Sequence, residues 1–232
     1  MSKYAARFSK EAYNLVKSGD KHKRWDLIDK NIEDTGFKVD RSKTNRDILY
    51  LVNETTGEHH IAVRGTDGNS KGLKNKQDIL TDLTFALGAE KHNKHFNKKV
   101  NRINKLVKQS DSKDITMSGH SLGGGITNEA IKSKKHVRDK VKHVDTYNAA
   151  FSPFTKNASK ATEKKLKSKV IHHRNKFDGV SASSLVNNTT GTIKEYDTKD
   201  IKKLPKFVPE HLKNAFNTID QLKAHSVDQF ID

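Results

Sequence analysis

The residues with the most evident chemistry lie at positions 119–123, where GHSLG fits the G-x-S-x-G pattern of a nucleophile elbow. In such an elbow a strand turns sharply into a helix, and any Cβ on the two glycines would collide with the neighbouring strand and helix. Residues 115–118 alternate as a short buried strand does, and a helix is expected to begin at Leu122. That helix would direct its free N–H groups at whatever the serine attacks. Ser121 is therefore the predicted nucleophile.

A serine hydroxyl becomes a good nucleophile when a base removes its proton and a carboxylate orients that base. In folds with such an elbow the partners follow in the order Ser, Asp, His, in loops beyond strand ends. Asp178 fits this order, because it comes soon after a predicted strand at 170–173 and opens an Asp-Gly turn. Asp145, inside a strand, is an alternative, and Asp197 and Asp200 are later options.

Two histidines follow these carboxylates in the chain, His211 and His225. His225 falls between a predicted helix and an apolar tail, whereas His211 begins a helix, where a solvated or capping role is favoured. His172 and His173 precede Asp178 and break the order. His225 is therefore the predicted base. His120 adjoins the nucleophile and must point elsewhere, so a packing role is expected for it.

The tetrahedral intermediate of such a reaction needs two N–H donors, which form an oxyanion hole. The N–H of Leu122, directly after the nucleophile, is the first. The second should come from a loop after an earlier strand, and Thr66 in the segment Arg64-Gly65-Thr66 suits this role.

Strands and helices alternate through most of the chain, which predicts an α/β fold. Apolar periodicity predicts helices over 4–16, 25–32, 77–87, 94–108, 122 to the lysines at 132–135, 158–167 and 212–222, and strands over 36–39, 47–53, 58–63, 115–118, 141–147, 170–173 and 192–197. A hairpin turn at 54–57 gives the sheet an antiparallel start. The later crossovers imply parallel strands, with helices on both faces. We expect a single domain over 1–232, in which 1–46 form a helical lead-in.

Composition narrows the partners and excludes several kinds of site. The chain carries 45 Lys and Arg against 28 Asp and Glu, a net charge of +17, and no cysteine. Disulfides, thiolate metal sites and a cysteine nucleophile are therefore excluded. The charge favours anionic partners such as acidic lipid headgroups, although the dispersal of the lysines weighs against nucleic acid. With no visible signal peptide or membrane-spanning run, an intracellular or particle-associated protein is expected rather than a classically secreted one.

Several motifs in this order resemble the class 3 lipase family. They are AVRGT at 62–66, DLTF at 82–85, GHSLGG at 119–124, YNA at 147–149, NKFD at 175–178 and HSVD at 225–228. The resemblance implies an α/β-hydrolase fold and hydrolysis of carboxylic esters, with lipid or small esters as substrates and neither metal nor cofactor. It assigns Ser121 as nucleophile, Asp178 and His225 as its partners, and Thr66 and Leu122 as oxyanion donors.

The chain departs from that family in the segment after Thr66. Secreted members carry an apolar lid there, whereas residues 67–76 hold one sizeable apolar side chain, Leu73. Such a polar, basic lid predicts no interfacial activation and suits an anionic phospholipid or a soluble ester. The alternative function is a lipase-like fold that serves as a basic binding or structural component on a membrane, nucleic acid or particle.

Overall fold

The computed structural model describes residues 3–17, 21–66, 94–151, 158–176, 178, 190–197 and 225–231. The predicted helices at 77–87 and 212–222, the polar lid at 67–76, and the candidates Asp200 and His211 lie outside these ranges.

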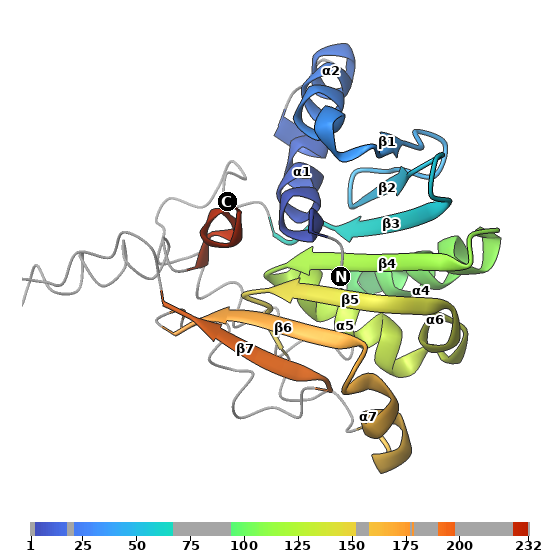
Figure 1. The fold of residues 1–232 in the computed structure, drawn as a ribbon, viewed down its shortest axis with the longest axis vertical. Helices are drawn as coiled ribbons and strands as arrows, with labels where there is room; N and C mark the ends of the chain where they lie inside the picture. Colours follow the sequence, from blue (N-terminus) through green and yellow to red (C-terminus); the bar gives the residue numbers. More distant parts are fainter. Residues whose placement is uncertain are drawn as a thin grey trace, which may run out of the picture.

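The described strands form one mixed sheet whose spatial order follows the chain (Figure 1). They are β1 (Lys38–Val39), β2 (Ile48–Val52), β3 (Glu58–Val63), β4 (Asp114–His120), β5 (Val141–Tyr147), β6 (Val170–Asn175) and β7 (Thr192–Tyr196). β1, β2 and β3 pair in antiparallel fashion, and every pairing from β3 to β7 is parallel. The prediction of a mixed, mostly parallel sheet that starts with an antiparallel hairpin is confirmed.

Helices cover both faces of this sheet, as predicted (Figure 1). The described helices are α1 (Ala5–Lys17), α2 (Lys21–Ile32), α4 (Lys94–Gln109), α5 (Leu122–Ser133), α6 (Lys135–Lys140) and α7 (Lys160–Leu166), with 3₁₀ turns η1 (Glu33–Thr35) and η4 (Val227–Phe230). The N-terminal helices α1 and α2 pack on one face, and α4, α5 and α6 on the other. None of the helices that the structure describes is long and apolar enough to cross a bilayer.

The side chains of strand β2 pack into two hydrophobic cores, one on each face of the sheet. Its side chains alternate between the faces, since successive residues of a strand point to opposite sides. Ile48 and Tyr50 join the larger core under α4 and α5, whereas Leu49 and Leu51 join the core under α1 and α2. All four are fully buried, which explains why this strand is apolar throughout.

The face beneath α1 contains an unusual number of buried polar side chains. Ser118 in β4 is fully buried and accepts a hydrogen bond from Ser9 of α1, with the two Oγ atoms 2.8 Å apart. His60 in β3 contacts Thr116 through Nδ1 at 2.8 Å and Ser118 through Nε2 at 2.9 Å. Burial lowers the pKa of His60 to about 3, so its ring is neutral at pH 7. Each of these polar groups therefore has a partner.

Most element boundaries lie within a few residues of the predictions, but three differ in informative ways. Helix α2 begins four residues before the predicted start, and β6 extends two residues beyond the predicted end to Asn175. Helix α6 was not predicted: its six residues, KHVRDK, bury only Val137 and so carry no apolar stripe. The extension of β6 matters most for function, because it brings the chain to Asp178.

Candidate active site

Ser121 lies between β4 and α5 in a backbone conformation that few non-glycine residues adopt. Its φ is 56° and its ψ is −128°. Hydrogen bonds on both sides hold this conformation: Ser121 N–H donates to the Tyr147 carbonyl at 3.0 Å, and its own carbonyl accepts from Ala150 N–H at 3.0 Å. Such strain persists only where the surroundings over-determine it, and it is often found at functional sites.

Two glycines allow the chain to pass through this turn. A Cβ on Gly119 would lie 2.5 Å from the carbonyl oxygen of Gly123 in α5, and a Cβ on Gly123 would overlap the carbonyl oxygen of Val63 in β3. The predicted clashes with the neighbouring strand and helix are confirmed. Both positions must therefore be glycine for α5 to start directly above β4.

His225 and Asp178, the predicted partners of Ser121, are hydrogen-bonded to each other. Nδ1 of His225 lies 3.0 Å from Oδ1 of Asp178, and the Asp178 side chain is fully buried. Since the carboxylate can only accept, Nδ1 carries the proton and Nε2 of a neutral ring is the acceptor. In the described part of the chain Nε2 of His225 is buried and has no hydrogen-bond partner. The ring thus has one unused basic nitrogen, as a general base requires before substrate binds.

The alternative carboxylates make other contacts. Asp145 lies within β5 and contacts Nε2 of His173 at 2.8 Å and Nε2 of His143 at 3.1 Å. Although burial raises it, these two histidines lower the pKa of Asp145 to about 2. Asp197 is exposed and pairs with Lys176 at 2.8 Å. Of the described carboxylates, Asp178 is the one that contacts His225.

His120 does more than the packing expected for it. Its Nε2 donates to the backbone carbonyl of His225, and its Nδ1 accepts from the hydroxyl of Tyr13 in α1 at 2.8 Å. Burial lowers the pKa of His120 to about 3, with the neighbouring His225 adding to the effect, so the ring stays neutral and keeps this proton arrangement. Tyr13, His120 and His225 therefore form a chain of hydrogen bonds that ends on the main chain of the candidate base.

Tyr13 was not predicted from the sequence, because its contact with His120 spans 107 positions and leaves no local pattern. Asn148 was also missed as an individual residue, although it lies in one of the family-like motifs. It is fully buried with φ at 41°, and its Oδ1 accepts from the N–H of Asn175 at 2.9 Å. Asn175 in turn accepts from Asp178 N–H at 3.1 Å. Asn148 thus ties the end of β5 to the turn that presents Asp178.

The two predicted oxyanion donors belong to different segments, the start of α5 and the loop after β3. Leu122 is the first residue of α5, so its N–H has no acceptor within the helix. Thr66 follows Gly65, where a Cβ would lie 3.3 Å from Cβ of Ser121. The loop that carries Thr66 therefore approaches the elbow closely, and both donors remain candidates for the oxyanion hole.

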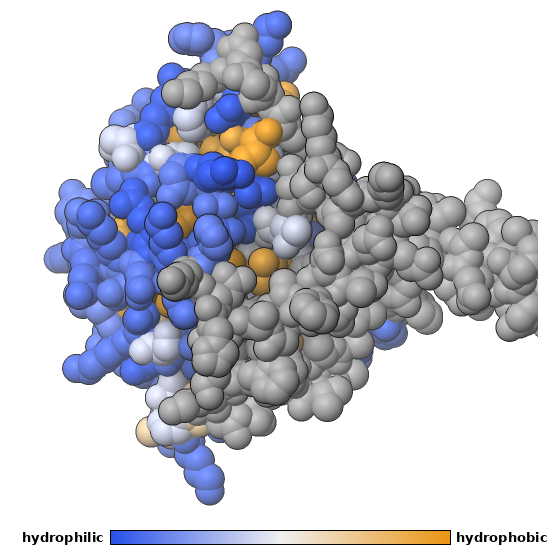
Figure 2. All heavy atoms as spheres, turned by 180° about the vertical axis from the view of Figure 1, so that it is seen from behind, coloured by the Kyte–Doolittle hydropathy of each residue, from blue (hydrophilic) through white to orange (hydrophobic). Residues whose placement is uncertain are grey.

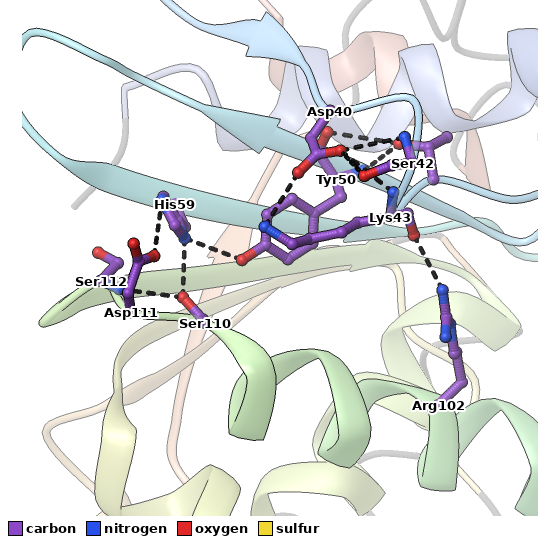
Figure 3. Close-up of polar contacts among 10 residues, drawn as sticks. Asp40, Ser42, Lys43, Tyr50, His59, Arg102, Ser110, Asp111 and Ser112 are labelled. Atoms are coloured by element: carbon purple, nitrogen blue, oxygen red, sulfur yellow. Dashed lines mark hydrogen bonds and ion pairs between the residues drawn. The ribbon is translucent and has the colours of Figure 1, made fainter.

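A cluster that contains a serine and a histidine lies at the opposite, amino-terminal edge of the parallel strands (Figure 3). Nδ1 of His59 is 2.7 Å from Oγ of Ser110 and 2.8 Å from the hydroxyl of Tyr50. The nearest carboxylate, Asp111, is 3.9 Å from Nε2 and has a side chain 94% exposed. Ser110 Oγ also accepts from the N–H of Ser112. This cluster joins α4 to the sheet but has no oriented carboxylate and no elbow, so it lacks the features of a nucleophilic site.

Within the described ranges no group of three His, Asp or Glu side chains is placed to hold a metal ion. The candidate site consists of a strained serine, a histidine–aspartate pair, and backbone N–H groups at a helix start.

Comparisons with known proteins give two similar solved structures and one family match. One similar solved structure is lipase II from Rhizopus niveus, with a TM-score of 0.44 and 14% identity; the match covers 78% of this chain and 72% of that chain. Another is a mutant form of MDLA from Penicillium cyclopium, with a TM-score of 0.40 and 18% identity; the match covers 88% of this chain and 79% of that chain. No curated protein sequence matches the chain. The profile of the lipase-like Mbeg1-like family matches residues 35–211, and the expected resemblance to lipases is confirmed. Since this match spans most of its length, the chain belongs to the Mbeg1-like family.

Proposed function

We propose that this protein is a serine hydrolase that cleaves carboxylic esters of lipids through an acyl-enzyme intermediate. Ser121 is the nucleophile, His225 the general base and acid, and Asp178 the carboxylate that orients the imidazole. The N–H groups of Leu122 and Thr66 form the oxyanion hole.

In this mechanism Oγ of Ser121 attacks the ester carbonyl carbon while its proton passes to Nε2 of His225. The carbonyl oxygen becomes an oxyanion that accepts from the two backbone donors. The intermediate collapses, the C–O bond to the alcohol breaks, and His225 gives its proton to the departing oxygen. Water then attacks the acyl-enzyme with His225 as base, which releases the carboxylic acid and restores the Ser121 hydroxyl.

The observation that carries this proposal is the hydrogen bonding of the two ring nitrogens of His225. Its Nδ1 is bonded to a buried carboxylate, while its Nε2 is buried without a partner. An unpartnered polar atom in the interior costs about 1–3 kcal/mol of stability, so a purely structural histidine would be expected to use both nitrogens. His60, His172 and His173 do so, each contacting a partner through Nδ1 and another through Nε2. A free acceptor on a histidine whose main chain is bonded to His120, the neighbour of the strained serine, supports catalysis rather than packing.

The proposed substrates are lipid esters, with phospholipids favoured by charge. The net charge of +17 attracts anionic headgroups, and the polar segment at 67–76 offers little apolar area for docking on a neutral oil droplet. Soluble short-chain esters should be cleaved as well, since the proposed chemistry depends on the carbonyl alone.

The test is hydrolysis of short p-nitrophenyl esters by the wild type and by Ser121→Ala. The proposal expects turnover by the wild type and none above background for the variant, with thermal stability nearly unchanged. Folded wild-type protein that turns over neither these esters nor phospholipid would contradict it. That result would favour the alternative function, a lipase-like fold retained as a basic binding component.

A further inference from the structure

A groove runs between α4 and the chain segment that leads into β2. Its volume is about 760 Å³, and one wall is formed by residues 45–48 while the other is formed by α4. Five of its described lining residues are cationic: Arg46, Lys98, Lys99, Arg102 and Lys105. Among these described residues Asp47 is the single acidic one.

The positive charge of this groove is largely uncompensated. Asp47 is already shared by two cations, with Oδ1 3.3 Å from Arg64 and 3.2 Å from Lys99. Arg46, Lys98 and Lys105 are exposed and have no acidic partner within the described part of the chain. Three unpaired cations along one groove form a site for an anion, because an anion there meets no opposing carboxylate of its own.

Arg102 adds a directed donor to this groove. Its Nη2 donates to the carbonyl of Lys43 at 3.3 Å, which holds the guanidinium across the space between α4 and the sheet (Figure 3). Its Nε is buried and has no hydrogen-bond partner among the described residues. Because this Nε is buried, a phosphate in the groove would meet the guanidinium through its other N–H groups, whose fixed planar arrangement suits phosphate oxygens.

The groove adjoins the edge of the sheet that carries the candidate active site. Nε of Arg64 donates to the carbonyl of Arg46 at 3.1 Å, and the N–H of Arg64 donates to the carbonyl of Asp47 at 3.0 Å. Arg64 directly precedes Gly65 and Thr66, the loop that approaches Ser121. The groove wall and the proposed oxyanion loop are thus bonded to each other.

The described lining also favours an anionic bilayer over nucleic acid as the partner of this groove. Its described residues include no Phe, Tyr or Trp, so they offer no aromatic platform on which nucleic-acid bases would stack. The surface over α4, α5 and α6, seen from behind the sheet, is mostly hydrophilic where its residues are described (Figure 2). Adsorption there must depend on charge rather than on buried hydrocarbon. We propose that the groove binds phosphate headgroups of an anionic bilayer and so holds the catalytic edge at the membrane surface.

Membrane binding through the groove can be measured independently of ester cleavage, although its use in catalysis rests on the proposed function. The variant Arg46→Gln/Lys98→Gln/Lys105→Gln removes three groove charges. A matched control, Lys160→Gln/Lys164→Gln/Lys167→Gln, removes three exposed charges at and just beyond α7. Both are made on Ser121→Ala, and binding is measured by co-sedimentation with phosphatidylcholine vesicles with and without phosphatidylglycerol.

The inference expects binding only when phosphatidylglycerol is present, weakened on the order of 100-fold by the groove variant and less than about fivefold by the control. Equal weakening by both variants would show that diffuse charge is responsible and overturn the assignment. Groove-dependent binding of a single-stranded oligonucleotide that is tighter than vesicle binding would overturn the lipid in favour of nucleic acid. If vesicles bind as expected but wild-type protein cleaves no ester, the groove stands and the proposed hydrolase fails.

Discussion

Nδ1 of His225 lies 3.0 Å from Oδ1 of Asp178, although 47 positions separate the two residues in the chain. A different aspartate–histidine pair, Asp145 in β5 with His173 in β6, is also buried and has a similar separation of 2.8 Å. The pairs differ at the other ring nitrogen: that of His173 contacts the hydroxyl of Tyr196 at 2.8 Å, whereas that of His225 has no partner in the described structure. In the proposed function this difference makes the pair of His225 the one available for catalysis and gives the pair of His173 a structural role.

Replacement of Asp178 by asparagine should therefore lower kcat by a factor of ~10⁴, because an amide that donates to Nδ1 would stabilise the wrong tautomer of His225. The matched variant, Asp145→Asn, should reduce thermal stability and leave kcat within about a few-fold. Steady-state kinetics on a soluble ester, together with melting temperatures, measure both effects. A larger loss of kcat in Asp145→Asn than in Asp178→Asn would mean that the wrong pair has been assigned to catalysis.

The hydrogen bonds of His120 predict a positioning role. Without the Nε2–H that donates to the carbonyl of His225, the base should be less well placed, and small displacements of catalytic groups can cost up to ~10²-fold. We expect His120→Ala to lower kcat by about 10- to 100-fold with little change in KM, and Tyr13→Phe to have a smaller effect in the same direction. His60→Gln is the control, since His60 is equally buried on this face but does not contact His225. A comparable fall in kcat in that control would indicate a general loss of stability instead.

These roles show what the sequence could and could not reveal. The pairing of Asp178 with His225 was predictable because turn chemistry and chain order point to these two residues. His120 and Tyr13 were not, because their contacts join residues 105 and 107 positions apart and leave no local pattern. The same holds for the buried polar layer: Thr116 and Ser118 alternate with apolar residues as in a strand with one solvated face, yet α1 covers them. Helix α6 was missed because a short lysine-rich segment without an apolar stripe resembles a loop.

The strained backbone of Ser121 predicts a stability gain in an inactive variant. Glycine tolerates φ near 56° far better than serine, so Ser121→Gly should relieve strain of about 1–3 kcal/mol, partly offset by the greater entropy of the unfolded chain. The expected net effect is a rise on the order of 1 kcal/mol in the free energy of unfolding, while Ser121→Ala stays near the wild type. Chemical denaturation of the three proteins measures this. A less stable glycine variant would show that the elbow is not strained.

Three buried histidines predict that the protein loses stability in mild acid. Burial lowers the pKa of His60 and His120 to about 3 and that of His172 to about 4, below their ordinary value of 6.5. Between pH 6.5 and 4 the unfolded chain binds protons at these sites that the folded protein does not, so the free energy of unfolding falls as the pH falls. Asp145 does not oppose this change, because its stabilising effect is lost only as the pH falls below 3.8 towards its folded pKa of about 2.

Each of these histidines should cost ~2 kcal/mol of stability on going from pH 6.5 to pH 5, from 1.36 kcal/mol per pH unit. Urea denaturation at the two pH values checks the sum, and His60→Gln should remove about a third of it. A free energy of unfolding that does not change between these pH values, or that rises in acid, would contradict the neutral state of these rings.

Covalent labelling by a fluorophosphonate tests the central claim most directly, because the probe reacts with a serine only when a neighbouring base activates it. The folded wild-type protein should be labelled at the peptide that contains Ser121, located by mass spectrometry, and labelling should fall sharply in Asp178→Asn. Ser110 and Ser118, which contact His59 and His60, should remain unlabelled. Absence of label from the folded wild type, or label that persists in Ser121→Ala, would contradict a catalytic Ser121.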